Sequence, residues 1–149
     1  MQQALTASYP VQKGDFVSAG EVSGSIKRKL KLLGVDSALT RRISVCAYEV
    51  ELNLIIHSMG GEMRFSVDEQ GITLDVSDVG PGIKDLSLAM KEGYSTAPEE
   101  VRMMGFGAGM GLPNMKRNAD EFHIESTYGV GTNIHMRFYL KKVHTAPKN

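Results

Sequence analysis

Residues 75–112 read DVSDVGPGIKDLSLAMKEGYSTAPEEVRMMGFGAGMGL, and this stretch decides the fold. A short apolar strand leads into Asp78, and two glycines follow at Gly80 and Gly82. A polar, methionine-dotted segment comes next and ends in four glycines at alternate positions: Gly105, Gly107, Gly109 and Gly111. Glycine at this density admits positive φ and lets the main chain approach a ligand closely. Main-chain N–H groups exposed before a helix form an anion site, so the stretch predicts nucleotide binding.

The bulk properties predict one soluble domain. A chain of 149 residues accommodates one core, so we expect a single domain over 1–149, with its core at about 12–140 and loose tails. The formal net charge of zero argues against nucleic acid as a partner. The single Cys46 fits a reducing compartment, and no apolar run reaches the roughly 20 residues that span a bilayer. Since the N-terminus also lacks a signal-peptide pattern, we expect a cytoplasmic protein that does not enter a membrane.

Periodicity and turn residues predict the order of the elements. We expect a loose segment 1–9, a strand 10–17, and a helix 18–33 that Ser18 caps together with Glu21. A second helix follows from Asp36 or Ser37 to about Ser58, and then a hairpin of strands 62–67 and 72–76. The rest of the chain is expected to form a short helix ending at Lys91, a lid at 93–104, a helix 108–119, and a hairpin of strands 122–126 and 132–140. This order lacks the βα alternation of a doubly wound sheet. It predicts an α+β fold, a two-layer sandwich with a mainly antiparallel sheet and helices on one face.

Two polar residues stand out on the second of these helices, which is otherwise apolar on most of its circumference. Glu49 and Asn53 are four residues apart, so they lie about 40° apart around the helix, one turn from each other on the same side. A carboxylate and an amide beside so much apolar surface need polar partners. The pair is therefore a candidate for binding or catalysis, although a solvated helix edge would show the same spacing.

Four features occur in this order along the chain: Glu49-x-x-x-Asn53, Asp78-x-Gly-x-Gly, the glycine series 105–111, and Gly129-x-Gly-Thr132. In this order and spacing they resemble the GHKL superfamily of ATPases, named for gyrase, the Hsp90 chaperones, histidine kinases and MutL. The resemblance covers about residues 12–140. Within the superfamily, the small size and the segment GFGAGMGLPNMKRNADEF look most like the bacterial anti-sigma-factor and switch-protein serine kinases.

The resemblance implies ATP and Mg²⁺ as ligands and assigns roles to residues. Asn53 would ligate Mg²⁺, Glu49 would be the general base, and Asp78 would accept a hydrogen bond from the adenine amino group. Thr132 would support the adenine contact. The remaining implied ATP-binding residues are Gly80, Gly82, Ile83, Gly105, Gly107, Ala108, Gly109, Met110, Gly111 and Leu112. Of these, the glycines after residue 104 would hold the phosphates, and Gly80 and Gly82 would let the chain turn beneath the base.

Plainer interpretations stand beside these roles. Asp78 and the glycines after it also suit an ordinary β-turn, and Gly129-Val-Gly-Thr132 suits a hairpin turn. His57 is better explained as a packed histidine at a helix end than as a catalyst. Val79 departs from the polar residue often found after the motif aspartate, which weakens the expectation of a water or metal contact there.

We expect an ATP-dependent serine/threonine protein kinase that phosphorylates a partner protein in a bacterial regulatory switch. Its partners would be ATP or ADP, a protein substrate or antagonist, and a sigma factor in some arrangements, with a homodimer left open. Two alternatives also stay open: a non-catalytic, ATP-dependent anti-sigma or partner-binding module, and a detached histidine-kinase catalytic domain. Only Glu49 favours the kinase over the non-catalytic module, because both would keep Asn53 and Asp78, and the histidine-kinase alternative needs a partner with a phosphoacceptor helix.

Overall fold

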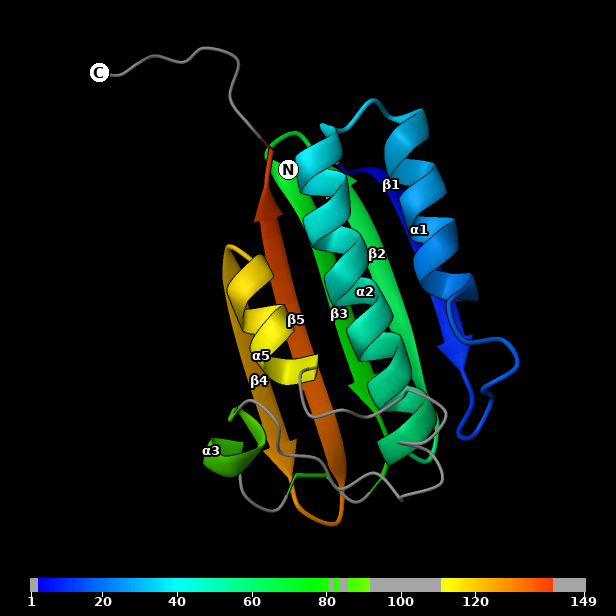
Figure 1. The fold of residues 1–149 in the computed structure, drawn as a ribbon, viewed down its shortest axis with the longest axis vertical. Coiled ribbons are helices and arrows are strands. Elements are labelled where there is room, and N and C mark those ends of the chain that lie inside the picture. Colours follow the sequence, from blue (N-terminus) through cyan, green and yellow to red (C-terminus); the bar gives the residue numbers. More distant parts are fainter. Residues whose placement is uncertain (1–2, 81, 84–85, 92–110, 141–149) are drawn as a thin grey trace.

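The structure is a computed structural model that describes residues 3–80, 82–83, 86–91 and 111–140. Within these residues, five strands form one sheet in the order β1-β2-β3-β5-β4, and all neighbours are antiparallel (Figure 1). The strands are β1 (Gln3–Val11), β2 (Gly61–Asp68), β3 (Gly71–Asp78), β4 (Glu121–Thr127) and β5 (Gly131–Tyr139). The helices are α1 (Glu21–Leu32), α2 (Ser37–His57), α3 (Leu86–Ala89) and α5 (Gly111–Asn118).

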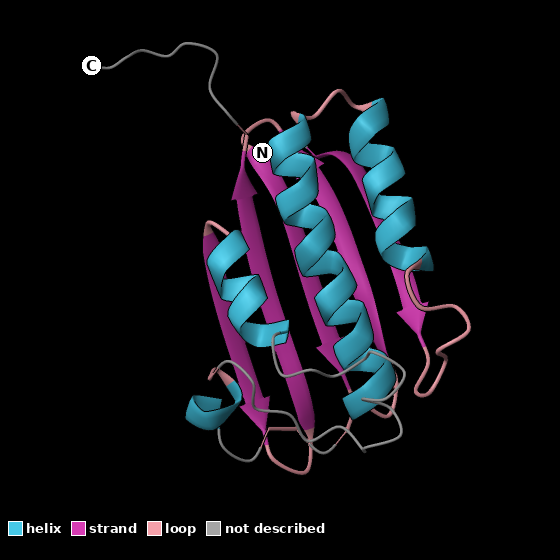
Figure 2. Cartoon of the chain, in the orientation of Figure 1, coloured by secondary structure: helices cyan, strands magenta, loops and turns pink. Residues whose placement is uncertain are grey.

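The helices α1, α2 and α5 cover one face of the sheet, with α2 between the other two (Figures 1 and 2). This arrangement confirms the predicted two-layer α+β sandwich. The predicted apolar stripe of α2 is buried along its whole length: Leu39, Ile43, Cys46, Val50 and Leu54. Strand alternation supplies the other half of the core, because every second residue of a strand points to the helices. On β2 these residues are Met63, Phe65 and Val67, all buried.

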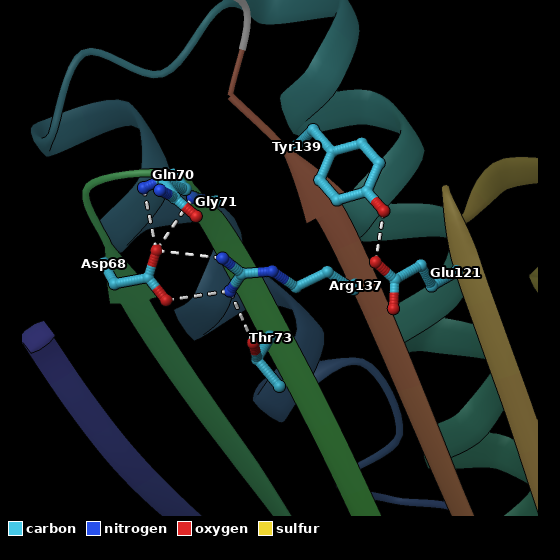
Figure 3. Close-up of polar contacts among 7 residues, drawn as sticks. All are labelled: Asp68, Gln70, Gly71, Thr73, Glu121, Arg137 and Tyr139. Atoms are coloured by element: carbon cyan, nitrogen blue, oxygen red, sulfur yellow. Dashed lines mark hydrogen bonds and ion pairs between the residues drawn. The ribbon is translucent and has the colours of Figure 1, made fainter. Parts of the chain in front are cut away.

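The opposite face of the sheet carries polar side chains, and Figure 3 shows one cluster on it. Asp68, at the end of β2, forms a two-pronged ion pair with Arg137 of β5, with N–O distances of 2.9 Å. Arg137 also donates to Thr73 of β3 at 2.8 Å, so one guanidinium ties three neighbouring strands together. The hydrogen bond from Arg137 lowers the pKa of Asp68 to about 2.

The expected position of the first strand was wrong. Residues 3–11 form β1, where a loose segment was expected, and the structure places no strand at residues 12–17. The reason lies in pairing: β1 runs beside β2 from Gln3 opposite Asp68 to Val11 opposite Gly61. β1 is an edge strand, which explains why it tolerates Pro10.

The start of the first helix was also wrong. α1 begins at Glu21 after Gly20, whose φ is 95°, and Ser18 does not cap it. The cap comes instead from Glu51 of α2, whose carboxylate accepts the N–H groups of Gly20 at 3.1 Å, Val22 at 3.3 Å and Ser23 at 3.1 Å. The Glu51 side chain is buried, at 2% exposure. Three donors and the positive end of a helix therefore compensate a buried carboxylate.

The other predicted elements are confirmed with small shifts. α2 begins after Asp36, which accepts the N–H of Leu39 at 3.1 Å, and both predicted hairpins form as β2–β3 and β4–β5. The short helix near Lys91 is α3. The helix expected at 108–119 is described from Gly111 to Asn118 as α5. The expected lid lies outside the described residues.

Candidate functional site

Glu49 and Asn53 share the side of α2 that faces the start of α5, as their spacing predicts. A Cβ placed on Gly111, the first residue of α5, would lie 3.4 Å from Glu49 Oε1 and 3.4 Å from Asn53 Oδ1. The two oxygens therefore converge on the bare main chain of Gly111. Because glycine has no side chain, residue 111 itself does not cover these oxygens.

Asp78 stands at the end of β3 and is partly buried. Its Oδ1 accepts the N–H of Thr132 at 2.9 Å. Burial raises the pKa of Asp78, and the hydrogen bond from Thr132 counteracts part of that rise. No described residue donates a hydrogen bond to Asp78 Oδ2, so this oxygen can accept one from a ligand. A partly desolvated carboxylate with a vacant acceptor suits the recognition of an amino group.

The two glycines after Asp78 fit a tight turn against the β4–β5 hairpin. Gly80 donates its N–H to the carbonyl of Val130 at 3.1 Å. Gly82 has φ +71°, and a Cβ there would lie 2.4 Å from the carbonyl oxygen of Thr127. The left-handed conformation and the close main-chain approach show why Gly82 is needed, and at Gly80 a Cβ would lie 3.0 Å from the main-chain nitrogen of Met59.

Ser126 holds the next part of the turn. Its hydroxyl accepts the N–H of Ile83 at 2.7 Å and pairs with the hydroxyl of Thr132 at 2.8 Å. Ser126 and Thr132 are directly opposite in the β4–β5 register. The turn after β3 and the final hairpin therefore form one hydrogen-bonded unit around Asp78.

The C-terminal ends of α2 and β3 lie at the same end of the molecule (Figure 1). Two main-chain hydrogen bonds join the segments that follow them: Met59 N–H to the carbonyl of Val79 at 2.7 Å, and Val79 N–H to the carbonyl of Gly60 at 3.1 Å. The connection fixes the helix that carries Asn53 to the strand that carries Asp78. The exposed Val79 takes part through its main chain.

A profile of the family described as histidine kinase-, DNA gyrase B-, and HSP90-like ATPase matches residues 38–142, which is more than half of the chain. The chain belongs to this ATPase family. The match begins in α2 and ends just after β5, so it includes Glu49, Asn53, Asp78 and Thr132. Membership confirms the GHKL resemblance and identifies ATP as the nucleotide of the family.

Two similar proteins show which members of the ATPase family this chain resembles. Serine/threonine-protein kinase RsbT of Bacillus subtilis (strain 168) is 30% identical over 131 residues, which are 85% of this chain and 90% of RsbT. An anti-sigma F factor of Caldanaerobacter subterraneus subsp. tengcongensis is 32% identical over 113 residues, which are 74% of this chain and 71% of that protein. Both relatives match the predicted subfamily of anti-sigma-factor and switch-protein kinases.

A solved structure supports the fold of this ATPase family member. A chain in the crystal structure of the SiaB–SiaC complex from Pseudomonas aeruginosa matches with a TM-score of 0.61. The match covers 91% of this chain and 89% of the other, at 10% sequence identity. At this identity the likeness concerns the fold alone.

The structure groups most of the described candidate residues into two sets. The first set is Glu49, Asn53 and Gly111. The second set is Asp78, Gly80, Gly82, Ile83 and Thr132. Leu112 is different, because it is 8% exposed and belongs to the hydrophobic core. The predicted phosphate-binding residues Gly105, Gly107, Ala108, Gly109 and Met110 lie outside the described residues.

Sequence reasoning missed three residues with defined contacts. Ser126 organises the turn after β3, Glu51 caps α1, and Asn114 of α5 donates its amide N–H to Glu49 Oε2 at 3.2 Å. The Ser126 contact follows from the hairpin register, since Ser126 is opposite Thr132. The other two contacts join residues that are far apart in sequence, and no local pattern reveals them.

His57 is the last residue of α2, as predicted for a packed histidine, and burial lowers its pKa. None of the helices in the described part of the chain combines the length and the hydropathy that a membrane span requires.

Proposed function

We propose that the protein is an Mg²⁺- and ATP-dependent serine/threonine kinase that phosphorylates a partner regulatory protein. The observation that carries the proposal is the convergence of Glu49 Oε1 and Asn53 Oδ1 on the main chain of Gly111. The similarity to the kinase RsbT and to the anti-sigma F factor supports a protein kinase over other activities within the ATPase family. The proposal includes a single ATPase domain over residues 1–149 and a cytoplasmic location.

The donor set fits Mg-ATP. Among the described residues, no group of three or more His, Cys, Asp or Glu side chains is arranged to hold a metal ion. Magnesium needs no such cage, because it retains waters and takes substrate phosphate oxygens with one or two protein oxygens. Asn53 Oδ1 would be that protein oxygen, and the phosphates would lie beside the main chain of Gly111, which has no side chain to exclude them. When bound, Mg²⁺ supplies neutralisation of phosphate charge.

The two sets of candidate residues have different roles in this proposal. Asp78 would orient the adenine through Oδ2, because Oδ1 is held by Thr132. Glu49 would accept the proton of the serine or threonine hydroxyl at Oε1, because Oε2 is occupied by Asn114. The glycine-rich residues before α5 would bind phosphate through main-chain N–H groups.

Incubation with γ-labelled ATP and the proteins encoded beside this one tests the proposal. We expect a labelled partner protein whose phosphate survives acid, as phosphoserine does. Glu49→Gln is expected to bind ATP and lose transfer, whereas Asn53→Ala is expected to lose Mg²⁺-dependent binding. Glu125→Gln, on the exposed face of β4, is the matched control and keeps both activities.

The outcomes separate the three hypotheses. An acid-labile, alkali-stable phosphate would support a histidine-kinase catalytic domain instead. ATP binding with partner capture but no transfer would support the non-catalytic module. A sigma factor and a homodimer partner are tested by co-elution with and without ATP.

A further inference from the structure

Asn114 connects the helix that follows the glycine-rich segment to the proposed general base. It lies one turn after Gly111 on α5, and α5 packs against α2. Its amide Nδ2 donates to Glu49 Oε2 at 3.2 Å. Its amide oxygen accepts from the guanidinium of Arg117, and its main-chain oxygen accepts from Asn118 Nδ2 at 2.8 Å. The amide is therefore held at both ends, which fixes the direction of its N–H.

The contact makes the two oxygens of Glu49 unequal. Oε2 is engaged by Asn114, and Oε1 is the oxygen that approaches Gly111. A free carboxylate can rotate about its last bond and exchange its oxygens. One hydrogen bond to a fixed donor removes that freedom, so the same oxygen faces Gly111.

The donor is the side-chain amide of Asn114, which is uncharged and therefore does not neutralise the carboxylate of Glu49. A lysine or arginine in this place would form an ion pair with Glu49 and take up more of its negative charge. An amide orients the carboxylate and leaves its charge largely available for a proton.

We propose that Asn114 is a positioning residue that holds Glu49 Oε1 toward the reacting hydroxyl. This inference rests on the proposed kinase function. Since Asn114 and Gly111 belong to one helical turn, a displacement of the start of α5 moves the phosphate-side main chain and the partner of the base together. Proton acceptance by Glu49 is in this way tied to the position of the α5 N-terminus.

Two variants test the role of Asn114. Asn114→Ala removes the donor, and we expect the transfer rate at saturating Mg-ATP to fall about tenfold or more through misorientation of the base. Asn114→Asp keeps the shape and the acceptor for Arg117 but places a like charge against Glu49, and its loss is expected to be larger. For both, the ATP dissociation constant and the midpoint of thermal unfolding are expected to stay near those of the parent protein.

Lys116→Ala is the control, because it truncates an exposed side chain of the same helix for which the structure shows no contact with Glu49 or Asn114. We expect it to retain the parental transfer rate. A further readout is the background of Glu49→Gln, in which Asn114→Ala is expected to change the residual rate by less than about twofold.

The results are read in order. Absence of transfer by the parent protein is a failure of the proposed function, and it is seen before any variant is measured. Transfer by the parent that persists unchanged in Asn114→Ala and Asn114→Asp overturns the positioning role alone. A loss that appears in ATP affinity or in thermal stability, and not in the transfer rate, assigns Asn114 a nucleotide contact or a structural role and also overturns it.

Discussion

At the scale of single residues, the candidate site depends on a glycine without a side chain as well as on polar side chains. Gly111 is the clearest case, because its missing side chain leaves room between the oxygens of Glu49 and Asn53. The distances of 3.4 Å are ordinary contacts, so a methyl group there fits the folded protein. In the proposed site it would stand where Mg-ATP meets both oxygens.

Gly111→Ala is therefore expected to leave the thermal unfolding midpoint unchanged or higher and to weaken Mg-ATP binding at least about tenfold, which corresponds to one lost hydrogen bond to a charged group. Calorimetric titration and a thermal melt measure both quantities. Gly24→Ala, in the middle of α1, is the control and should gain about 0.5–1 kcal/mol without affecting ATP. Undiminished Mg-ATP affinity in Gly111→Ala would place the phosphates elsewhere.

Asp78 presents the same relation between stability and binding, for an electrostatic reason. Its folded-state pKa is raised above the unfolded value by burial, so its charged form is disfavoured in the fold. The stability that it contributes is present below the ordinary pKa of 3.8 and is lost as the pH rises through the raised pKa. At neutral pH the ionised group therefore costs stability.

Asp78→Asn keeps an oxygen for the N–H of Thr132 and removes the buried charge. We expect its thermal midpoint at pH 7 to equal or exceed that of the parent protein, and its preference for ATP over GTP to fall. Melts at pH 7 and near pH 4, with titrations of both nucleotides, check this. A variant that melts well below the parent at pH 7, or that keeps full ATP selectivity, contradicts the assignment.

At the scale of elements, long-range capping decides where helices begin. Local rules place the start of α1 at Ser18, because serine with Glu21 three residues later matches a capping box. The observed cap is Glu51, about 30 positions away, and it was not predicted because a glutamate on an apolar helix gives no sign of its partner. In contrast, helix periodicity was enough to bring Glu49 and Asn53 together. Most of residues 3–11 were expected to be loose, and their strand was missed because it depends on pairing with β2, which is distant in sequence.

Glu51→Ala leaves three N–H groups at the start of α1 without their acceptor. We expect a loss of about 3 kcal/mol or more in the free energy of unfolding, since each buried unsatisfied donor costs about 1–3 kcal/mol. Urea unfolding followed by circular dichroism measures it. Glu62→Gln, an exposed residue paired with Arg64, is the control and should change stability by less than about 0.5 kcal/mol. Equal effects of the two substitutions would refute the capping role.

At the scale of the whole molecule, α2 is the central element, buried between α1, α5 and the sheet. Cys46 lies in its middle with no exposed surface, and burial raises the pKa of its thiol to about 12. Its Sγ approaches the main-chain oxygen of Met115 of α5 at 3.7 Å. A reagent reaches this thiol only when the helices separate.

Cys46 is therefore expected to resist thiol reagents at pH 8 in the native protein and to react fully in denaturant. If labelling requires global opening, Mg-ATP at 100 times its dissociation constant should slow it about a hundredfold, because a ligand of the folded state depopulates the open state. Colour released by an aromatic disulfide reagent follows the reaction. Rapid labelling of the native protein, or labelling indifferent to Mg-ATP, contradicts this account.

The order of the strands has a consequence for synthesis on the ribosome. β5 lies between β3 and β4, although it is the last strand of the described chain, and it supplies the N–H that holds Asp78. A nascent chain that has released only its first 120 residues contains Glu49, Asn53 and Asp78, yet it lacks both Ser126 and Thr132. The hydrogen bond from Thr132 to Asp78 forms only when the final hairpin leaves the exit tunnel. If Asp78 binds adenine as proposed, a nascent chain that lacks this hairpin is expected to bind ATP more weakly than the chain that includes it.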